Sequence, residues 1–280
     1  MTSTLKNKTR RTPSPSGSTP SGPTPSGRGK WLRFAVAGTV VAAVAFALIY
    51  FFGGAAPAEV DLDSTVNALT ATTEAGGGES TATTTTAVPS ASALTDVSGN
   101  WSVDTTTGAF SFEEATATFA GFRVEEELVR IGAATAVGRS PEVSGSVTID
   151  GTNIMQAEIA VDLTAIVSDE SRRENAIREA LNTSQNPTAT FVLTEPLDFG
   201  EVPLEGVTVS ATATGDLTIN GVTRTVEIPL EAQVAGESIL IVGSTNVVFA
   251  DYGIDTPSAP IVLSVADQGT IELQLWLVRA

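Results

Sequence analysis

The sequence predicts a mainly β protein: an eight-stranded antiparallel barrel with one amphipathic helix, preceded by one transmembrane helix. From about Ser98 onward, apolar and polar residues alternate with a period of two, as in strands that have one buried face. One segment inside this region has helical spacing instead. An uncharged apolar run near the N-terminus is long enough to span a bilayer.

The membrane-spanning helix is expected within residues 31–54. Residues 34–52 carry no charge, and this run of 19 residues at ~1.5 Å each spans about 28 Å. Basic residues between 28 and 33 precede it, which favours a cytoplasmic N-terminus and an extracytoplasmic C-terminal domain in a single-pass protein of the cell membrane. Cleavage of a signal peptide after Ala58 is the competing interpretation, although the apolar region of such peptides is normally ~7–15 residues.

Composition divides the remaining chain into three parts. Residues 1–30 are basic and rich in Ser, Pro and Thr, which predicts a disordered cytoplasmic tail. Residues 55–97 are acidic and rich in Thr, Ser, Ala and Gly, which predicts a flexible linker, with a helical turn or two around Val60 to Leu69. Residues 98–280 form the expected barrel domain.

Charge and missing residue types exclude several classes of function. The formal net charge is −17, and all 32 acidic residues lie at Glu59 or beyond. The exported part should therefore repel nucleic acids. Cysteine and histidine are both absent, so the chain has no Ser-His-Asp triad and no thiolate or imidazole ligand for a metal. We expect neither an enzyme nor a cofactor.

Alternating runs and turn dipeptides together give about eight strands. Asp150-Gly151 and Asn220-Gly221 separate such runs and predict two tight hairpins. The clearest runs have inward positions at Val143 to Ile149, Met155 to Leu163, Ala189 to Leu193, Val207 to Ala213, Val226 to Ala232 and Ile271 to Leu277.

The helical segment covers Asp169 to Asn182. Ser171 and Glu174 fit a capping box, and Glu174 with Arg178 forms a favourable i,i+4 pair. Pro187 keeps the helix from continuing far. One such helix can lie against the barrel or over one of its ends.

An eight-stranded barrel either fills its interior with side chains or holds one small ligand. Small residues recur at the predicted inward positions: Gly145, Ala157, Ala189, Ala211, Ala213 and Ala232. They leave space only if bulky side chains do not cross from the opposite strands. The filled and the hollow barrel therefore both remain open.

The chain from Trp101 to Arg279 resembles the YceI-like, polyisoprenoid-binding family. The resemblance rests on the order and spacing of several short stretches: residues 101–104, Phe119, Phe122, 144–151, Arg172-Arg173, 187–191, 215–224 and 252–254. It implies a lipocalin-like barrel whose tunnel holds an isoprenoid or a similar long amphiphile, and an exported, non-enzymatic role in sequestration or transport. Family members commonly have two histidines that this chain lacks, so no headgroup contact of theirs carries over.

Two sets of residues are candidates for ligand binding. The apolar lining is expected from Phe122, Val147, Ile159, Ile177, Leu181, Phe191, Leu217, Val226 and Ile228. A polar headgroup would find cations at Arg172, Arg173, Arg123 and Arg224. Ordinary core packing is the alternative for the first set, and a solvated face paired with Glu170 and Glu174 is the alternative for the second.

The acidic clusters predict neither a catalytic pair nor a metal site. Glu113-Glu114 and Glu125-Glu126-Glu127 favour a solvated strand edge over paired catalytic carboxylates. Asp251, Asp255 and Asp267 do not have the spacing of an EF-hand calcium loop, so no metal site is expected. The rival function is a surface adhesion or scaffold module with a filled core, a protein partner and no ligand.

Overall fold

The structure is a computed structural model that describes residues 56–75, 94, 96–256 and 260–280. Within these ranges, no helix is both long and apolar enough to cross a bilayer. The predicted tail, 1–30, and the predicted membrane segment, 31–54, lie outside the described residues.

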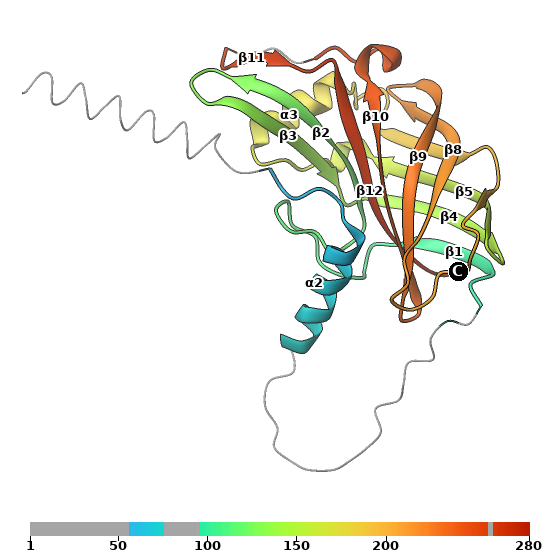
Figure 1. Cartoon of the computed structure of the whole chain (residues 1–280). Helices are drawn as coiled ribbons and strands as arrows, with labels where there is room; N and C mark the ends of the chain where they lie inside the picture. Colours follow the sequence, from blue (N-terminus) through green and yellow to red (C-terminus); the bar gives the residue numbers. More distant parts are fainter. Residues whose placement is uncertain (1–55, 76–93, 95, 257–259) are drawn as a thin grey trace, which may run out of the picture. The chain divides into compact units, whose positions relative to one another are not determined.

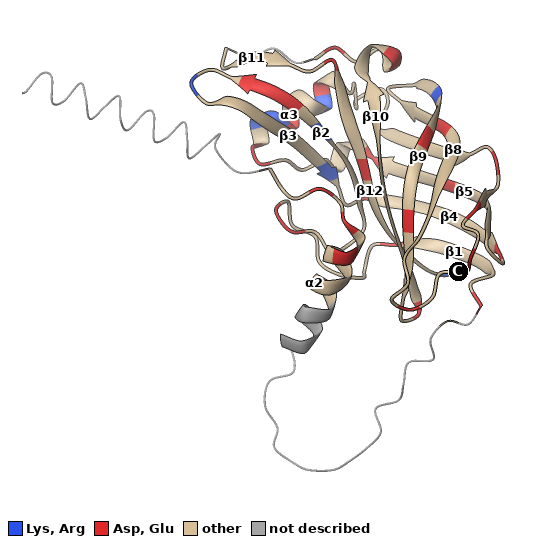
Figure 2. Ribbon diagram, viewed as in Figure 1, with Lys and Arg blue, Asp and Glu red and all other residues tan. Residues whose placement is uncertain are grey.

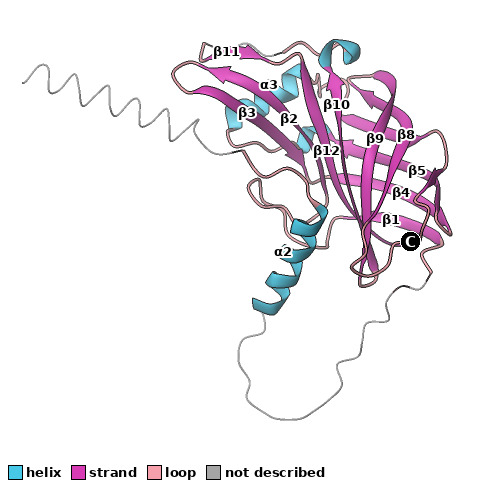
Figure 3. Ribbon diagram, in the orientation of Figure 1, coloured by secondary structure: helices cyan, strands magenta, loops and turns pink. Residues whose placement is uncertain are grey.

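The described chain is mainly β, with two α-helices and two short 3-10 helices (Figures 1 and 3). The helical elements are α2 (Leu62–Ala75), η1 (Leu163–Ala165), α3 (Ser171–Ala180) and η2 (Phe249–Tyr252). The strands are β1 (Gly99–Asp104), β2 (Phe119–Leu128), β3 (Gly132–Ser140), β4 (Val143–Asp150), β5 (Asn153–Asp162), β6 (Thr188–Leu193), β7 (Leu197–Asp198), β8 (Val209–Ile219), β9 (Val222–Ala235), β10 (Ser238–Val248), β11 (Val262–Val265) and β12 (Gln268–Arg279).

Eight of these strands close into a barrel, in the order β1-β4-β5-β6-β8-β9-β10-β12. The closing contact is antiparallel, with Trp101 of β1 opposite Arg279 of β12. The neighbouring pairs around the ring are antiparallel as well. The eight-stranded antiparallel barrel predicted from the sequence is thus confirmed.

Strand β12 changes partner along its length. Residues Trp276 to Arg279 pair with β1, whereas Thr270 to Gln274 pair with β2. Strand β2 in turn pairs with β3 and β11. We call β2, β3 and β11 the arm; it extends the sheet at one end of the barrel (Figure 1).

Both predicted tight hairpins are confirmed. Asp150 lies opposite Asn153 at the β4–β5 turn, where Gly151 has a φ of 60°. Ile219 lies opposite Val222 at the β8–β9 turn, and both turn residues have positive φ, 52° at Asn220 and 73° at Gly221. Two consecutive residues in this conformation match the right-handed twist of the flanking strands.

Helix α3 is the predicted amphipathic helix, but it begins differently from the prediction. Its N-cap is Glu170, which makes no side-chain capping bond. The carboxylate of Glu174 instead accepts a hydrogen bond from the backbone N–H of Ser168 at 3.3 Å. The proposed capping box is therefore wrong, because Ser171 is already inside the helix. The predicted pair of Glu174 and Arg178 is present at 3.5 Å.

A second helix, α2, lies within the segment predicted as a linker. The expected helical turn around Val60 to Leu69 is confirmed, and the helix is longer, running from Leu62 to Ala75. Leu62 is only 1% exposed, since it packs on the outer surface of the barrel. Part of residues 55–97 therefore belongs to the folded domain.

Buried side chains gather at the two ends of the barrel interior. One cluster, around Trp101, Val234 and Leu277, fills the end where β1 joins. The other, around Ile166 and Tyr252, fills the end that α3 and η2 cover. Residues of both clusters, among them Val147 and Leu217, also line the cavity of the barrel.

Candidate functional site

The barrel encloses an apolar cavity with a volume of about 170 Å³. One buried water needs about 10–15 Å³ on the same measure. The cavity therefore has room for roughly 11–17 water-sized groups, which is far more than a packing defect. Its lining comes from strand β2, from strands β4 to β10 and from β12, together with η1, η2 and residues that follow η1, α3 and η2.

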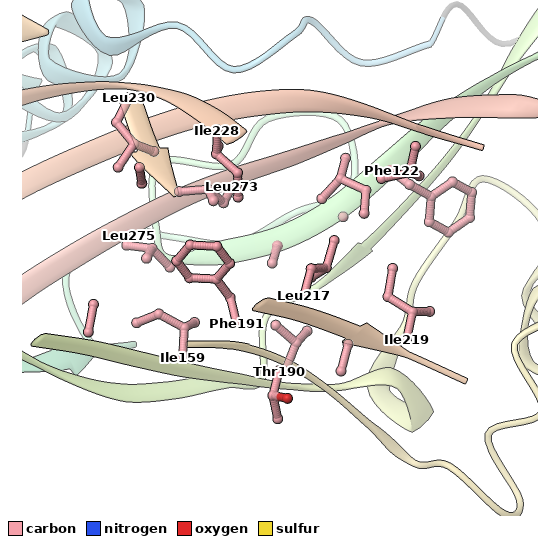
Figure 4. Close-up of a pocket in the computed structure, with 18 of the residues that line it drawn as sticks. Phe122, Ile159, Thr190, Phe191, Leu217, Ile219, Ile228, Leu230, Leu273 and Leu275 are labelled. Atoms are coloured by element: carbon pink, nitrogen blue, oxygen red, sulfur yellow. The ribbon is translucent and has the colours of Figure 1, made fainter. Parts of the chain in front are cut away.

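The chemistry of the lining is uniform. None of the lining residues carries a charge, and Thr190 is the one whose side chain has a polar atom. Figure 4 shows aromatic and aliphatic side chains converging from several strands, among them Phe191, Leu217 and Leu273. A guest inside this cavity would bury apolar surface, which favours binding. A charged group on the guest would find no partner there.

Cross-strand pairs of a glycine and a large residue keep the interior open. A Cβ on Gly215 would lie 2.3 Å from the Phe191 ring, so this ring contacts the glycine of the neighbouring strand, which is opposite Leu193. In three more pairs the large side chain contacts the glycine directly opposite it: Phe122 and Gly138, Ile159 and Gly145, and Leu230 and Gly243. Large inward side chains are therefore held against the wall instead of meeting in the centre.

Gly138→Ala tests this mechanism. A Cβ at Gly138 would lie 2.8 Å from the Phe122 ring, and its nearest neighbours are side chains and not backbone. We expect the ring to move into the cavity and guest affinity to fall about ten-fold, with unfolding free energy lower by about 1–3 kcal/mol. Binding titration and urea unfolding measure the two effects. Adding Phe122→Leu should restore binding; an unchanged affinity in Gly138→Ala would contradict the mechanism.

Seven of the nine predicted lining residues line the cavity: Phe122, Val147, Ile159, Leu181, Phe191, Leu217 and Ile228. Ile177 and Val226 do not; both pack in the cluster at the α3 end. Several lining residues were not singled out from the sequence, notably Leu230, Leu273 and Leu275. Each continues an alternating run that the sequence shows, so the period-two pattern could have found them.

The four predicted headgroup cations do not line the cavity. Arg173 is bound to Glu126 at 2.6 Å and to Asp169 at 3.0 Å. Arg123 contacts Glu272 at 3.4 Å. Arg172 and Arg224 are exposed. Two of the four are thus paired with carboxylates, and two remain accessible on the outside.

Tyr252 is a buried polar group at the α3 end. It is 2% exposed, and its hydroxyl has no hydrogen-bond partner among the described groups. Burial raises the pKa of this phenol above its usual value, and the nearby charge of Arg224 opposes that shift. The hydroxyl therefore stays protonated at neutral pH.

The predicted strand edge at Glu125 to Glu127 is wrong, because β2 pairs there with β3 on one side and with β11 on the other. Glu126 binds Arg173, and Glu125 accepts a hydrogen bond from Thr135 at 2.9 Å. Figure 2 shows acidic positions spread along the strands and loops of the barrel, with fewer basic positions among them. In the part of the chain that the structure describes, no three acidic side chains come together as a metal site.

A closed barrel of eight strands around an apolar cavity defines the lipocalin-like class of small barrels. Within that class, the chain belongs to the YceI-like domain family, whose model matches residues 83–277. The resemblance inferred from the sequence is thereby confirmed. The match begins earlier than the predicted domain boundary at residue 98.

Individual relatives are similar to this protein over part of its chain. A UPF0312 protein of Shewanella denitrificans is 29% identical over 154 residues, which cover 51% of this chain and 76% of that protein. A UPF0312 protein of Pseudomonas aeruginosa is 29% identical over 147 residues, covering 49% and 73%. A solved polyisoprenoid binding domain from Saccharophagus degradans is similar with a TM-score of 0.49 and 16% identity, covering 64% of this chain and 98% of that domain.

Proposed function

We propose that the barrel binds one neutral, long apolar chain, an isoprenoid or a similar amphiphile, for sequestration or transport. The observation that carries this proposal is the cavity of about 170 Å³ with no charged side chain in its lining. A filled core, which the rival scaffold function requires, would have closed this space. Membership in the YceI-like family supports a lipid-binding function.

The lining and the volume restrict the guest. A charged group inside would lack a partner, so only the apolar part of an amphiphile enters. The cavity has room for roughly 11–17 water-sized groups, and this space would hold about two or three five-carbon isoprene units. A longer chain, and any headgroup, would extend beyond the cavity; Arg172 and Arg224 are the two candidate headgroup cations that are exposed.

A chain-length series tests this function. Neutral isoprenoid alcohols of increasing length are titrated into purified protein that has been extracted with organic solvent to remove any resident lipid. Each added methylene should contribute ~0.8 kcal/mol until about 10–15 carbons are buried, after which affinity should level off. Mass spectrometry of the extract identifies a natural guest. Absence of both uptake and co-purified amphiphile would overturn the proposal.

We also propose that the barrel is exported and tethered to the cell membrane by residues 31–54, with residues 1–30 on the cytoplasmic side. Support comes from the uncharged run 34–52 and from the basic residues that precede it. A membrane tether would let a lipid enter the barrel without crossing much water. Carbonate extraction of membranes followed by gel sizing distinguishes an uncleaved anchor from cleavage after Ala58.

A further inference from the structure

The outer surface of the barrel has a covered apolar strip on β10 and β12. Leu240, Val242 and Trp276 point away from the cavity, yet they are 0%, 4% and 1% exposed. Leu62 of α2 belongs to the same buried apolar cluster. Beside them, the Thr65 hydroxyl donates a hydrogen bond to the side-chain carbonyl of Gln274 at 2.7 Å, in a buried position. Residues 57–69, which we call the strap, thus cover this strip.

Charged groups bind the start of the strap. Arg139 donates to the carbonyl oxygen of Ala58 at 2.6 Å, and Arg123 donates to that of Pro57. Both arginines also contact Glu272, which is 1% exposed. The strap therefore supplies the remaining acceptors for a buried ionic cluster, as well as the cover for an apolar strip. Two independent kinds of contact hold it in place.

We propose that the strap fixes the barrel close to the membrane anchor, so that the tether is much shorter than the linker 55–97 suggests. This inference rests on the proposed anchor and not on the proposed ligand. Five residue steps separate Phe52 from Pro57, and a fully extended chain covers at most ~3.6 Å per step, or about 18 Å. An undocked segment from Phe52 to Val97 would span about 37 Å on average as a flexible chain. Residues 76–95 then join two parts of one domain.

The docking point lies next to the ligand site. Arg123 follows Phe122 on β2, and Phe122 lines the cavity. The carbonyl of Pro57 is bound on one face of this strand, while the other face belongs to the cavity wall. The docked end of the tether thus lies beside the cavity-lining strand β2.

A nicked full-length chain tests the strap. A protease site is inserted within residues 80–90, the protein is cleaved after folding, and membranes are washed with high salt. In the native chain we expect the barrel fragment to stay on the membrane, and in detergent to co-purify with the N-terminal fragment. Leu62→Asp buries a carboxylate in the apolar strip, so at least about ten-fold more barrel should appear in the wash.

Asn67→Asp is the matched control, because it adds the same charge at an exposed position of α2. It should retain the barrel as the native chain does. Release of the native barrel after cleavage, both from membranes and in detergent, would overturn the proposal. Fragments that stay together but are found in the soluble fraction would overturn its membrane part. Guest uptake is measured separately, so a failure of the ligand proposal remains distinguishable.

Discussion

Ala157→Phe should weaken guest binding roughly 100-fold without unfolding the barrel. Ala157 lies on β5, and its side chain faces the cavity opposite Val147. A phenyl ring there occupies the space of about four guest carbons, and ~0.8 kcal/mol per methylene amounts to about 3 kcal/mol, or roughly a 100-fold loss of affinity. Titration with a neutral isoprenoid alcohol measures the loss.

Stability separates this effect from misfolding. Filling a cavity costs at most about 1–3 kcal/mol of unfolding free energy where the ring is crowded, so the variant should remain folded. Ala160→Phe is the control, because Ala160 is on the same strand but does not line the cavity. It should bind the guest like the native protein. Equal losses in both variants would mean that the cavity is not the binding site.

Glu272→Gln is expected to destabilise the domain by about 3–5 kcal/mol. Glu272 accepts a hydrogen bond from Arg139 at 2.9 Å and contacts Arg123 at 3.4 Å. Both Glu272 and Arg139 are almost completely buried. Removal of the carboxylate charge leaves the Arg139 guanidinium uncompensated where water cannot reach it. Urea unfolding monitored by tryptophan fluorescence measures the change.

Two further variants test whether the uncompensated charge of Arg139 causes the loss of stability. Glu125→Gln, at an exposed position on β2, should change the unfolding free energy by no more than about 0.5 kcal/mol. Replacement of the buried pair by Arg139→Met with Glu272→Met removes both charges, and should cost less than Glu272→Gln alone. A double variant that is less stable than the single one would show that the uncompensated charge is not the cause.

Local patterns determined most of the strands. The two hairpins follow from Asp150-Gly151 and Asn220-Gly221, because Gly151, Asn220 and Gly221 adopt the positive φ that these turns require. Alternation also predicted most of the inward residues of β4, β5, β6, β8, β9 and β12. Met155 and Val207, which it placed inward, are instead 43% and 42% exposed, and a register shift between Thr148 and Ile149 interrupts the alternation where β4 pairs with β5. The hairpins and the regular alternation depend on residues that are close together in the chain, so the sequence alone predicts them.

Only the tertiary structure shows which side chains are buried on the outside of the barrel. The run Ile239-Leu240-Ile241-Val242 is apolar without alternation, which is typical of a strand covered on both faces. The cover is Leu62, more than 170 residues earlier in the chain, within a segment whose composition predicts a linker. Ile177 and Val226 illustrate the same limit, because packing of the barrel end drew them into a cluster beside the cavity.

By itself, the sequence determined the barrel, its family and the apolar character of its interior. Whether that interior was hollow depended on strand register, which places Gly138 opposite Phe122 and Gly145 opposite Ile159. Such pairs join residues of different strands, and only the folded sheet shows which glycine receives which large side chain. Open space in the centre is therefore a property of packing across strands, decided by the tertiary structure.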